Sequence, residues 1–142
     1  MNSERLTAIL FKILNRSTEF KTALGGGIYK GSFRPMDSLK DDACVNVLAL
    51  TRDNPQVGIA NVNIYVGDLK QSINGKEQNV PNYQKLENLS DIATKSISEA
   101  LTADEFKDIG FTILEDKTWK NEGNNRPEHY QNLRLQFTIP KN

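Results

Sequence analysis

The stretch 24–31, with the sequence LGGGIYKG, is the first place in the chain whose residue types suit chemistry. Three glycines followed by a lysine could form a loop that binds phosphate through backbone N–H groups. Phosphate loops of this kind follow a strand and open a helix, so that the helix dipole also points at the anion. Here a helical pattern precedes the glycines and a strand pattern follows them. Because the order is reversed and Gly31 follows Lys30, we expect a helix stop, with Gly25 in the left-handed conformation.

Acid–base or metal chemistry has few candidates in this chain. They are one histidine, His129, and the aspartates Asp37, Asp41 and Asp42. A lone histidine cannot build a transition-metal site without carboxylates, and paired acids usually bind Mg²⁺ with a third carboxylate and a substrate phosphate. We interpret the aspartates as a solvated turn and His129 as a surface or edge residue, with Glu128 pointing to the opposite face. A small hydrolase or nuclease using Asp41, Asp42 and His129 is the least favoured hypothesis.

Cys44 is the only cysteine, so the chain cannot form an internal disulfide or a cluster of thiolate metal ligands by itself. It lies in the apolar segment ACVNVLAL, where the simplest interpretation is a small core hydrophobe. Asn46 interrupts the same segment, and if buried it needs hydrogen-bond partners, for which a subunit contact is one source. The sequence therefore predicts no catalytic, cofactor-binding or metal-binding residues, and no enzymatic activity.

Charge and composition also limit the partners. The chain has 142 residues with 37% hydrophobic residues, and its 18 basic and 18 acidic residues cancel. A balanced charge provides no field that attracts nucleic acid or an anionic membrane. Tyr65, Trp119 and Tyr130 could stack on bases, but their strands are not basic, and Trp119 equally suits a protein interface. We therefore expect no membrane partner and no direct sequence-specific binding of nucleic acid.

Targeting signals are not evident in the sequence. The amino-terminal segment is interrupted by Arg5, Thr7 and Lys12, unlike the apolar core of a signal peptide. No stretch approaches the roughly 18 apolar residues that span a bilayer. We expect a soluble protein that is intracellular when synthesised.

Two amphipathic helices are predicted. The first follows Ser3, which we expect to cap it, with Glu4 in the first turn and a short helical turn capped by Ser17 after it. The second begins after the predicted cap Asn82, and a capping box is expected at 102–105 before a short turn that ends at Gly110. Their inward stripes have helical spacing. These stripes are Leu6, Ile9, Leu10, Ile13 and Leu14, and then Leu86, Leu89, Ala93, Ile97, Ala100 and Leu101.

Strand patterns fill the remaining chain. Segments 28–33, 43–50 and 57–68 precede the second helix, and 111–120 and 129–140 follow it. The segments 43–50 and 57–68 flank a turn and are predicted to form an antiparallel hairpin. In 57–68, Ala60, Val62, Ile64 and Val66 alternate with polar residues, as Leu133, Leu135, Phe137 and Ile139 do in the last strand. In 111–120, Phe111, Ile113 and Trp119 are expected on one side, although Leu114 disturbs the alternation.

The segment 67–81, GDLKQSINGKEQNVP, is polar and contains the strong turn signal Asn74–Gly75. It is either a surface loop or a hairpin arm that projects from the body. Helix, strands, helix and strands follow one another without a repeat or linker. We therefore predict one domain over 1–142 of the α+β class: a mostly antiparallel sheet with two main helices packed on one face.

This layout resembles the tail terminator proteins of bacteriophages and prophages, also called tail completion, minor tail or head–tail joining proteins. The resemblance covers nearly the whole chain as element order and length. Its local features are GGGIYKG after the first helix and the closing strand EHYQNLRLQFTI. The inserted segment 67–81 departs from the family pattern, as a partner-specific decoration or as the mark of a different neck component.

The resemblance implies a structural role in the virion. Family members form a homo-oligomeric ring, typically of six subunits, that caps the finished tail tube, stops its growth and offers a surface to the head connector. The expected partners are thus the chain itself, the tail tube protein and the head connector or neck protein. The expected location is the tail or neck of the virion, and the host cytoplasm during assembly. The alternative is a non-viral α+β module that binds a protein or small ligand without catalysis.

Overall fold

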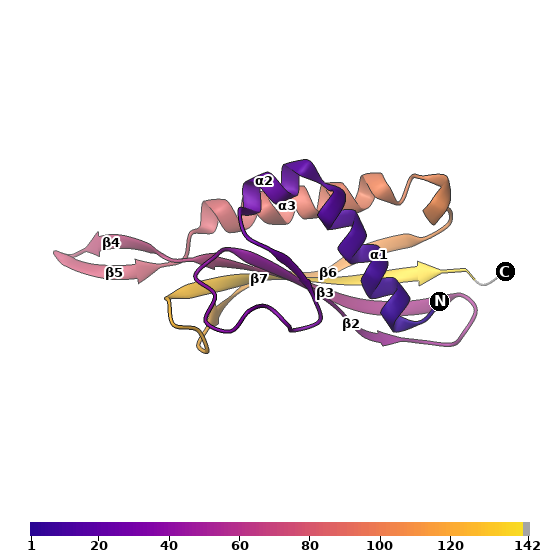
Figure 1. Cartoon of the computed structure of the whole chain (residues 1–142), viewed down its shortest axis with the longest axis horizontal. Helices are drawn as coiled ribbons and strands as arrows, with labels where there is room; N and C mark the ends of the chain where they lie inside the picture. Colours follow the sequence, from indigo (N-terminus) through magenta and orange to yellow (C-terminus); the bar gives the residue numbers. More distant parts are fainter. Residues whose placement is uncertain (141–142) are drawn as a thin grey trace.

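The computed structural model describes residues 1–140, so the last two residues of the domain expected over 1–142 lie outside the described residues. The fold is α+β, as predicted, with three helices gathered on one face of a mostly antiparallel sheet (Figure 1). The elements in chain order are α1 (Ser3–Arg16), α2 (Thr18–Leu24), β1 (Ile28–Lys30), β2 (Asp42–Leu50), β3 (Gln56–Gly67), β4 (Leu69–Ile73), β5 (Lys76–Val80), α3 (Tyr83–Ala100), a 3₁₀ turn (Asp104–Phe106), β6 (Gly110–Asn121) and β7 (Glu128–Ile139).

The main sheet has the strand order β1-β2-β3-β7-β6. All neighbours are antiparallel except β1 and β2, which are parallel. The predicted hairpin of β2 and β3 is confirmed. The parallel pair is an addition to the prediction, and it exists because the segment 31–41 carries the chain back before β2 begins. We call this segment the strap.

The core lies between the helices and one face of the sheet. The alternating apolar residues of β3 and β7 predicted to point inward are all buried, and the inner stripes of α1 and α3 pack on them. The stripe of α1 is confirmed for Leu6, Leu10, Ile13 and Leu14, while Ile9 is partly buried against the same core. Burying one such side chain contributes roughly 1.5–3 kcal/mol, so this face accounts for most of the favourable energy.

The ends of the three α-helices follow the predictions except at the start of α1. Ser17 caps α2 by accepting from the Phe20 N–H, and Asn82 caps α3 by accepting from the Lys85 N–H. For α1 the cap is Asn2, not Ser3. The Asn2 backbone is extended and its side chain accepts from the Arg5 N–H at 2.8 Å, so Ser3 is already the first helical residue.

The capping box predicted at 102–105 is wrong. The Thr102 hydroxyl donates backwards to the Glu99 carbonyl oxygen at 2.6 Å, so it does not accept from the next turn. A 3₁₀ turn forms instead with Ala103 before it and no side-chain cap. The predicted content of this turn is correct, since Phe106 is buried and Ile109 packs against the core.

The prediction that Trp119 lies on the same face of the sheet as Phe111 is wrong. A bulge between Ile113 and Glu115 shifts the register of β6 against β7, and an extra residue reverses the alternation beyond it. Phe111 therefore pairs with inward-facing Phe137, whereas Trp119 pairs with Tyr130 on the other face. The disturbance noted at Leu114 in the sequence marks this bulge. We call the face opposite the helices the open face, because within residues 1–140 no helix covers it.

Candidate functional site

The glycine run does not form a phosphate loop. Gly25 ends α2 in the left-handed conformation, with φ at +85°, as predicted. The following glycines lie against the start of β2, where the Gly27 N–H donates to the Asp42 carboxylate at 2.8 Å. A Cβ on Gly26 would lie 1.9 Å from the Asp41 carbonyl oxygen. The anion that the glycine run binds is therefore a side chain of its own protein, and the run needs glycine for close approach.

Asp41 and Asp42 do not lie in a solvated turn, which corrects the sequence interpretation. Asp42 is the first residue of β2 and is fully buried. Its carboxylate accepts from the Arg34 Nε at 3.1 Å and from the Ser38 hydroxyl at 2.6 Å. The strap folds over the start of β2 to bring Arg34 and Ser38 to this carboxylate. Asp37 alone of the three aspartates stays exposed.

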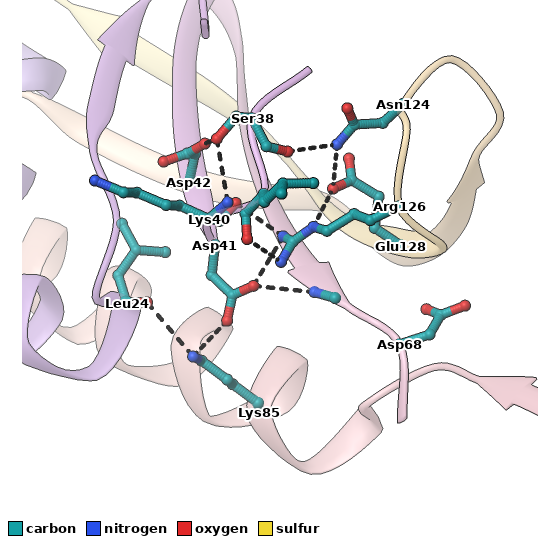
Figure 2. Close-up of polar contacts among 12 residues, drawn as sticks. Leu24, Ser38, Lys40, Asp41, Asp42, Asp68, Lys85, Asn124, Arg126 and Glu128 are labelled. Atoms are coloured by element: carbon teal, nitrogen blue, oxygen red, sulfur yellow. Dashed lines mark hydrogen bonds and ion pairs between the residues drawn. The ribbon is translucent and has the colours of Figure 1, made fainter. Parts of the chain in front are cut away.

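Asp41 joins the same region to α3 and to the end of β3. It accepts from the ammonium of Lys85, from the Arg126 Nη2 at 2.9 Å and from the Gly67 N–H at 3.0 Å (Figure 2). Burial on its own would raise the pKa of Asp41, but these hydrogen bonds outweigh it and hold the pKa below its ordinary value. The carboxylate stays charged and tied to three elements.

Glu128 is the residue that sequence reasoning missed. It opens β7, its side chain is fully buried, and it accepts from two guanidinium groups. The distances are 2.6 Å from the Arg34 Nη1 and 2.8 Å from the Arg126 Nε, with further bonds from the amides of Asn121 and Asn124. Burial would raise the pKa of Glu128, but these donors lower it to about 2. The signal in the sequence that could have indicated this site is the segment 121–128, NEGNNRPE, which is rich in asparagine and contains Arg126.

We call these groups the ionic cluster. Its six members are Arg34, Asp41, Asp42, Lys85, Arg126 and Glu128. Three positive and three negative charges balance, which is the condition under which charges can be buried. Figure 2 shows Arg126 reaching between Asp41 and Glu128, with Lys85 approaching from α3 below. Each carboxylate is saturated with donors, so the cluster holds segments together rather than presenting a reactive group.

The cluster sits at the base of a hairpin formed by β4 and β5, which turns at Asn74–Gly75 as the sequence signal predicts. We call this hairpin, residues 69–80, the arm. Asp41 binds the Gly67 N–H just before it, and the Asp68 N–H donates to the Pro127 carbonyl oxygen at 2.9 Å. Figure 1 shows the arm extending well beyond the sheet and helices. The cluster therefore fixes the point and direction in which the arm leaves the body.

His129 lies at the base of the arm, and the structure does not bring it together with Asp41 and Asp42 in one site. Its Nδ1 lies 2.7 Å from Asp68 Oδ1, and the side chains of both residues are largely buried. Glu128 points to the opposite face, as predicted, because successive strand residues alternate. Asp41, Asp42 and His129 thus have separate partners, and within residues 1–140 no group of three or more His, Cys, Asp or Glu could hold a metal ion.

The remaining candidates lie on or near the open face. Cys44 is a buried apolar residue, as predicted, although it pairs with Asn63 and lies outside the main core cluster. Burial raises its pKa to about 11. Asn46 is partly buried and faces Asn61. Tyr65 lies beside Tyr130, with ring centroids 5.2 Å apart, and the Arg34 guanidinium covers it at 4.3 Å.

Comparisons with known proteins add no name to this geometry. No protein-family model matches the chain, and no curated protein matches it significantly. Among the described residues, no helix is both long and apolar enough to cross a membrane. Function must therefore be argued from the arm, its base and the exposed surfaces.

Proposed function

We propose that this chain is a structural assembly protein of the tail terminator type. In this role, identical copies form a ring, typically of six, that caps the tail tube of a bacteriophage or prophage and joins it to the head connector. The partners are then the chain itself, the tube protein and the connector. The protein works in the virion neck after assembly in the host cytoplasm. The resemblance of the element order to that family motivates this proposal.

The observation that carries the proposal is the arm. All but one of its strand residues are exposed, and its two strands form a sheet of their own. An isolated two-stranded hairpin is marginally stable at best in water. A chain that holds such a hairpin away from its body, on a base of buried ion pairs, presents it to a partner. A subunit that closes a ring needs such an element, because ring contacts join two different surfaces of the same protein.

The strap supports the alternative of a non-viral binding module. It carries Phe33, Met36 and Leu39 with their side chains largely exposed, while Arg34 anchors it from beneath. Exposed apolar side chains on an anchored loop suit contact with another protein. Oligomeric state separates the two functions, because only the ring requires the chain to assemble with itself.

Two measurements test the proposal. Sedimentation and negative-stain microscopy of the purified protein should show ring particles well above the 16.0 kDa monomer. Deleting the gene from the phage that encodes it should yield separate heads and tails, with tails of uncontrolled length, and a plasmid copy should restore joined particles. Normal virions after the deletion would refute the proposal, as would a chain that stays monomeric at high concentration and is absent from purified particles.

A further inference from the structure

The two faces of the arm differ in chemistry. Because paired residues share a face, Leu69 and Val80 lie together, as do Gln71 with Gln78 and Ile73 with Lys76. The opposite face carries Lys70 and Glu77, whose charged groups are 3.6 Å apart, with Ser72 and Asn79. The first face thus carries all three large apolar residues of the arm beside two glutamines and Lys76, and we call it the apolar face; the other is polar.

The apolar face is only partly covered by its own chain. Leu69 is 50% exposed and Ile73 is 39% exposed. A hairpin that buries little and has both edges unpaired gains stability only when another surface covers it. The arm therefore requires a partner that offers apolar contacts and backbone hydrogen bonds.

The margin formed by β6 offers both. It is the outer strand of the main sheet, and within the described residues nothing pairs with its free side. Three large apolar side chains are exposed along it: Ile113 at 41%, Leu114 at 49% and Trp119 at 44%. Tryptophan is enriched among residues that dominate protein interfaces. The Lys117 ammonium lies 4.3 Å from the Trp119 ring centroid, which holds the indole in place on the open face.

The length of β6 suits the arm. Beyond the bulge, 115–121 pair with β7 in regular register, which is longer than either five-residue strand of the arm. The bulge and the lysines of β6 disfavour pairing along the whole edge of the sheet. They leave room for one short strand in one position.

We infer that the arm of one copy docks along β6 of the next copy, with Leu69 and Ile73 covering Trp119 on the open face of that strand. This inference rests on the proposed ring. The arm tip and the β6 margin are different surfaces, so each copy gives one and receives one. Repeating this contact around an axis uses both surfaces of every subunit and leaves neither exposed, which is the condition for a closed ring.

The experiment uses one double variant for each surface. The arm variant carries Leu69→Asp and Ile73→Asp, and the β6 variant carries Leu114→Ser and Trp119→Ser. All four side chains are exposed, so both proteins should fold, which circular dichroism verifies. Ser72→Asp on the polar face of the arm and Thr112→Ser on β6 are the matched controls. At concentrations at which the wild type forms rings, sedimentation velocity should show monomers of each double variant, because its dissociation constant is raised at least tenfold. The controls should form wild-type rings.

Mixing the two double variants gives the decisive result. Each retains the surface that the other lacks, so an equimolar mixture should form a dimer and nothing larger, although each variant alone is monomeric. A mixture that stays monomeric, or variants that still form rings, would overturn the docking of the arm on β6 without affecting the proposed function. A wild-type chain that never assembles would remove the proposed ring and this contact together.

Discussion

Replacing Glu128 with glutamine should measure the strength of the ionic cluster. Glutamine keeps the shape of the side chain but removes the charge that Arg34 and Arg126 bind at 2.6 and 2.8 Å. The pKa of Glu128 falls from an ordinary 4.5 to about 2 in the folded protein. At about 1.36 kcal/mol per pKa unit, this difference is worth about 3 kcal/mol at neutral pH. Removing one partner from a buried ion pair typically costs about 3–5 kcal/mol, which agrees.

The sign of the pH dependence follows from the lowered pKa. A carboxylate whose folded pKa is depressed stabilises the protein fully above its unfolded pKa, and loses this contribution as the pH falls toward the folded value. The wild-type advantage over Glu128→Gln should therefore be about 3 kcal/mol at pH 7, about 2 kcal/mol at pH 3.5, and still smaller near pH 2. Urea unfolding curves of both proteins at several pH values supply these differences.

Glu122→Gln is the matched control. Glu122 lies in the same β6–β7 connection, but its side chain is 80% exposed and its contact with Lys120 is long, at 3.7 Å. Exposed pairs of this kind contribute little, so this change should alter stability by less than about 0.5 kcal/mol at any pH. The reasoning fails if Glu128→Gln costs no more than the control, or if its cost does not shrink as the solution is acidified.

Three further predictions concern the fold. Leu10→Ala and Leu135→Ala, both at fully buried sites, should each lower the free energy of unfolding in urea by roughly 2–5 kcal/mol. A loss under about 0.5 kcal/mol would contradict the inward orientation of these residues. Gly25→Ala should cost about 1–2 kcal/mol because φ is +85°, whereas Gly123→Ala, which has open space and no positive φ, should cost less; equal losses would contradict the left-handed helix end. Cys44, buried and with its pKa raised to about 11, should resist thiol reagents at pH 8 until urea unfolds the chain; rapid labelling of the native protein would contradict its burial.

The helices and most strand faces could be predicted because their signals are local. The stripe of α1 and the alternation of β3 follow from periods of 3.6 and 2, which depend only on neighbours in the sequence. The helix stop at Gly25 is equally local, since it depends on one residue that accepts positive φ. The predicted side of Trp119 is wrong because one extra residue at the bulge reverses which face each later residue of β6 occupies. Leu114 was the only sign of this bulge in the sequence.

The site was harder to predict because its members meet only in the fold. Arg34 and Asp42 are 8 residues apart, but Glu128 is 94 residues from Arg34. Each looks like an ordinary charged residue of a loop or strand end. The composition gives the charged residues, but it does not show which of them are buried together in the fold. The sequence did single out Asp41 and Asp42 as a pair, but their partners come from the strap, α3 and the β6–β7 connection, and no spacing rule connects these segments.

The placement of the cluster is informative beyond its stability. A buried ion network is often no more stable than an apolar replacement of the same volume, and its best-attested use is to fix register. Apolar contacts do not have direction, whereas the bonds of Arg126 and Asp41 specify where Gly67 and Pro127 sit, and so where the arm leaves the body. In a ring, an angular error at one contact is repeated at every contact and prevents closure. The proposed ring contact therefore requires an arm whose direction is fixed by hydrogen bonds at its base. A mobile arm on an apolar base would not hold the angle that ring closure needs.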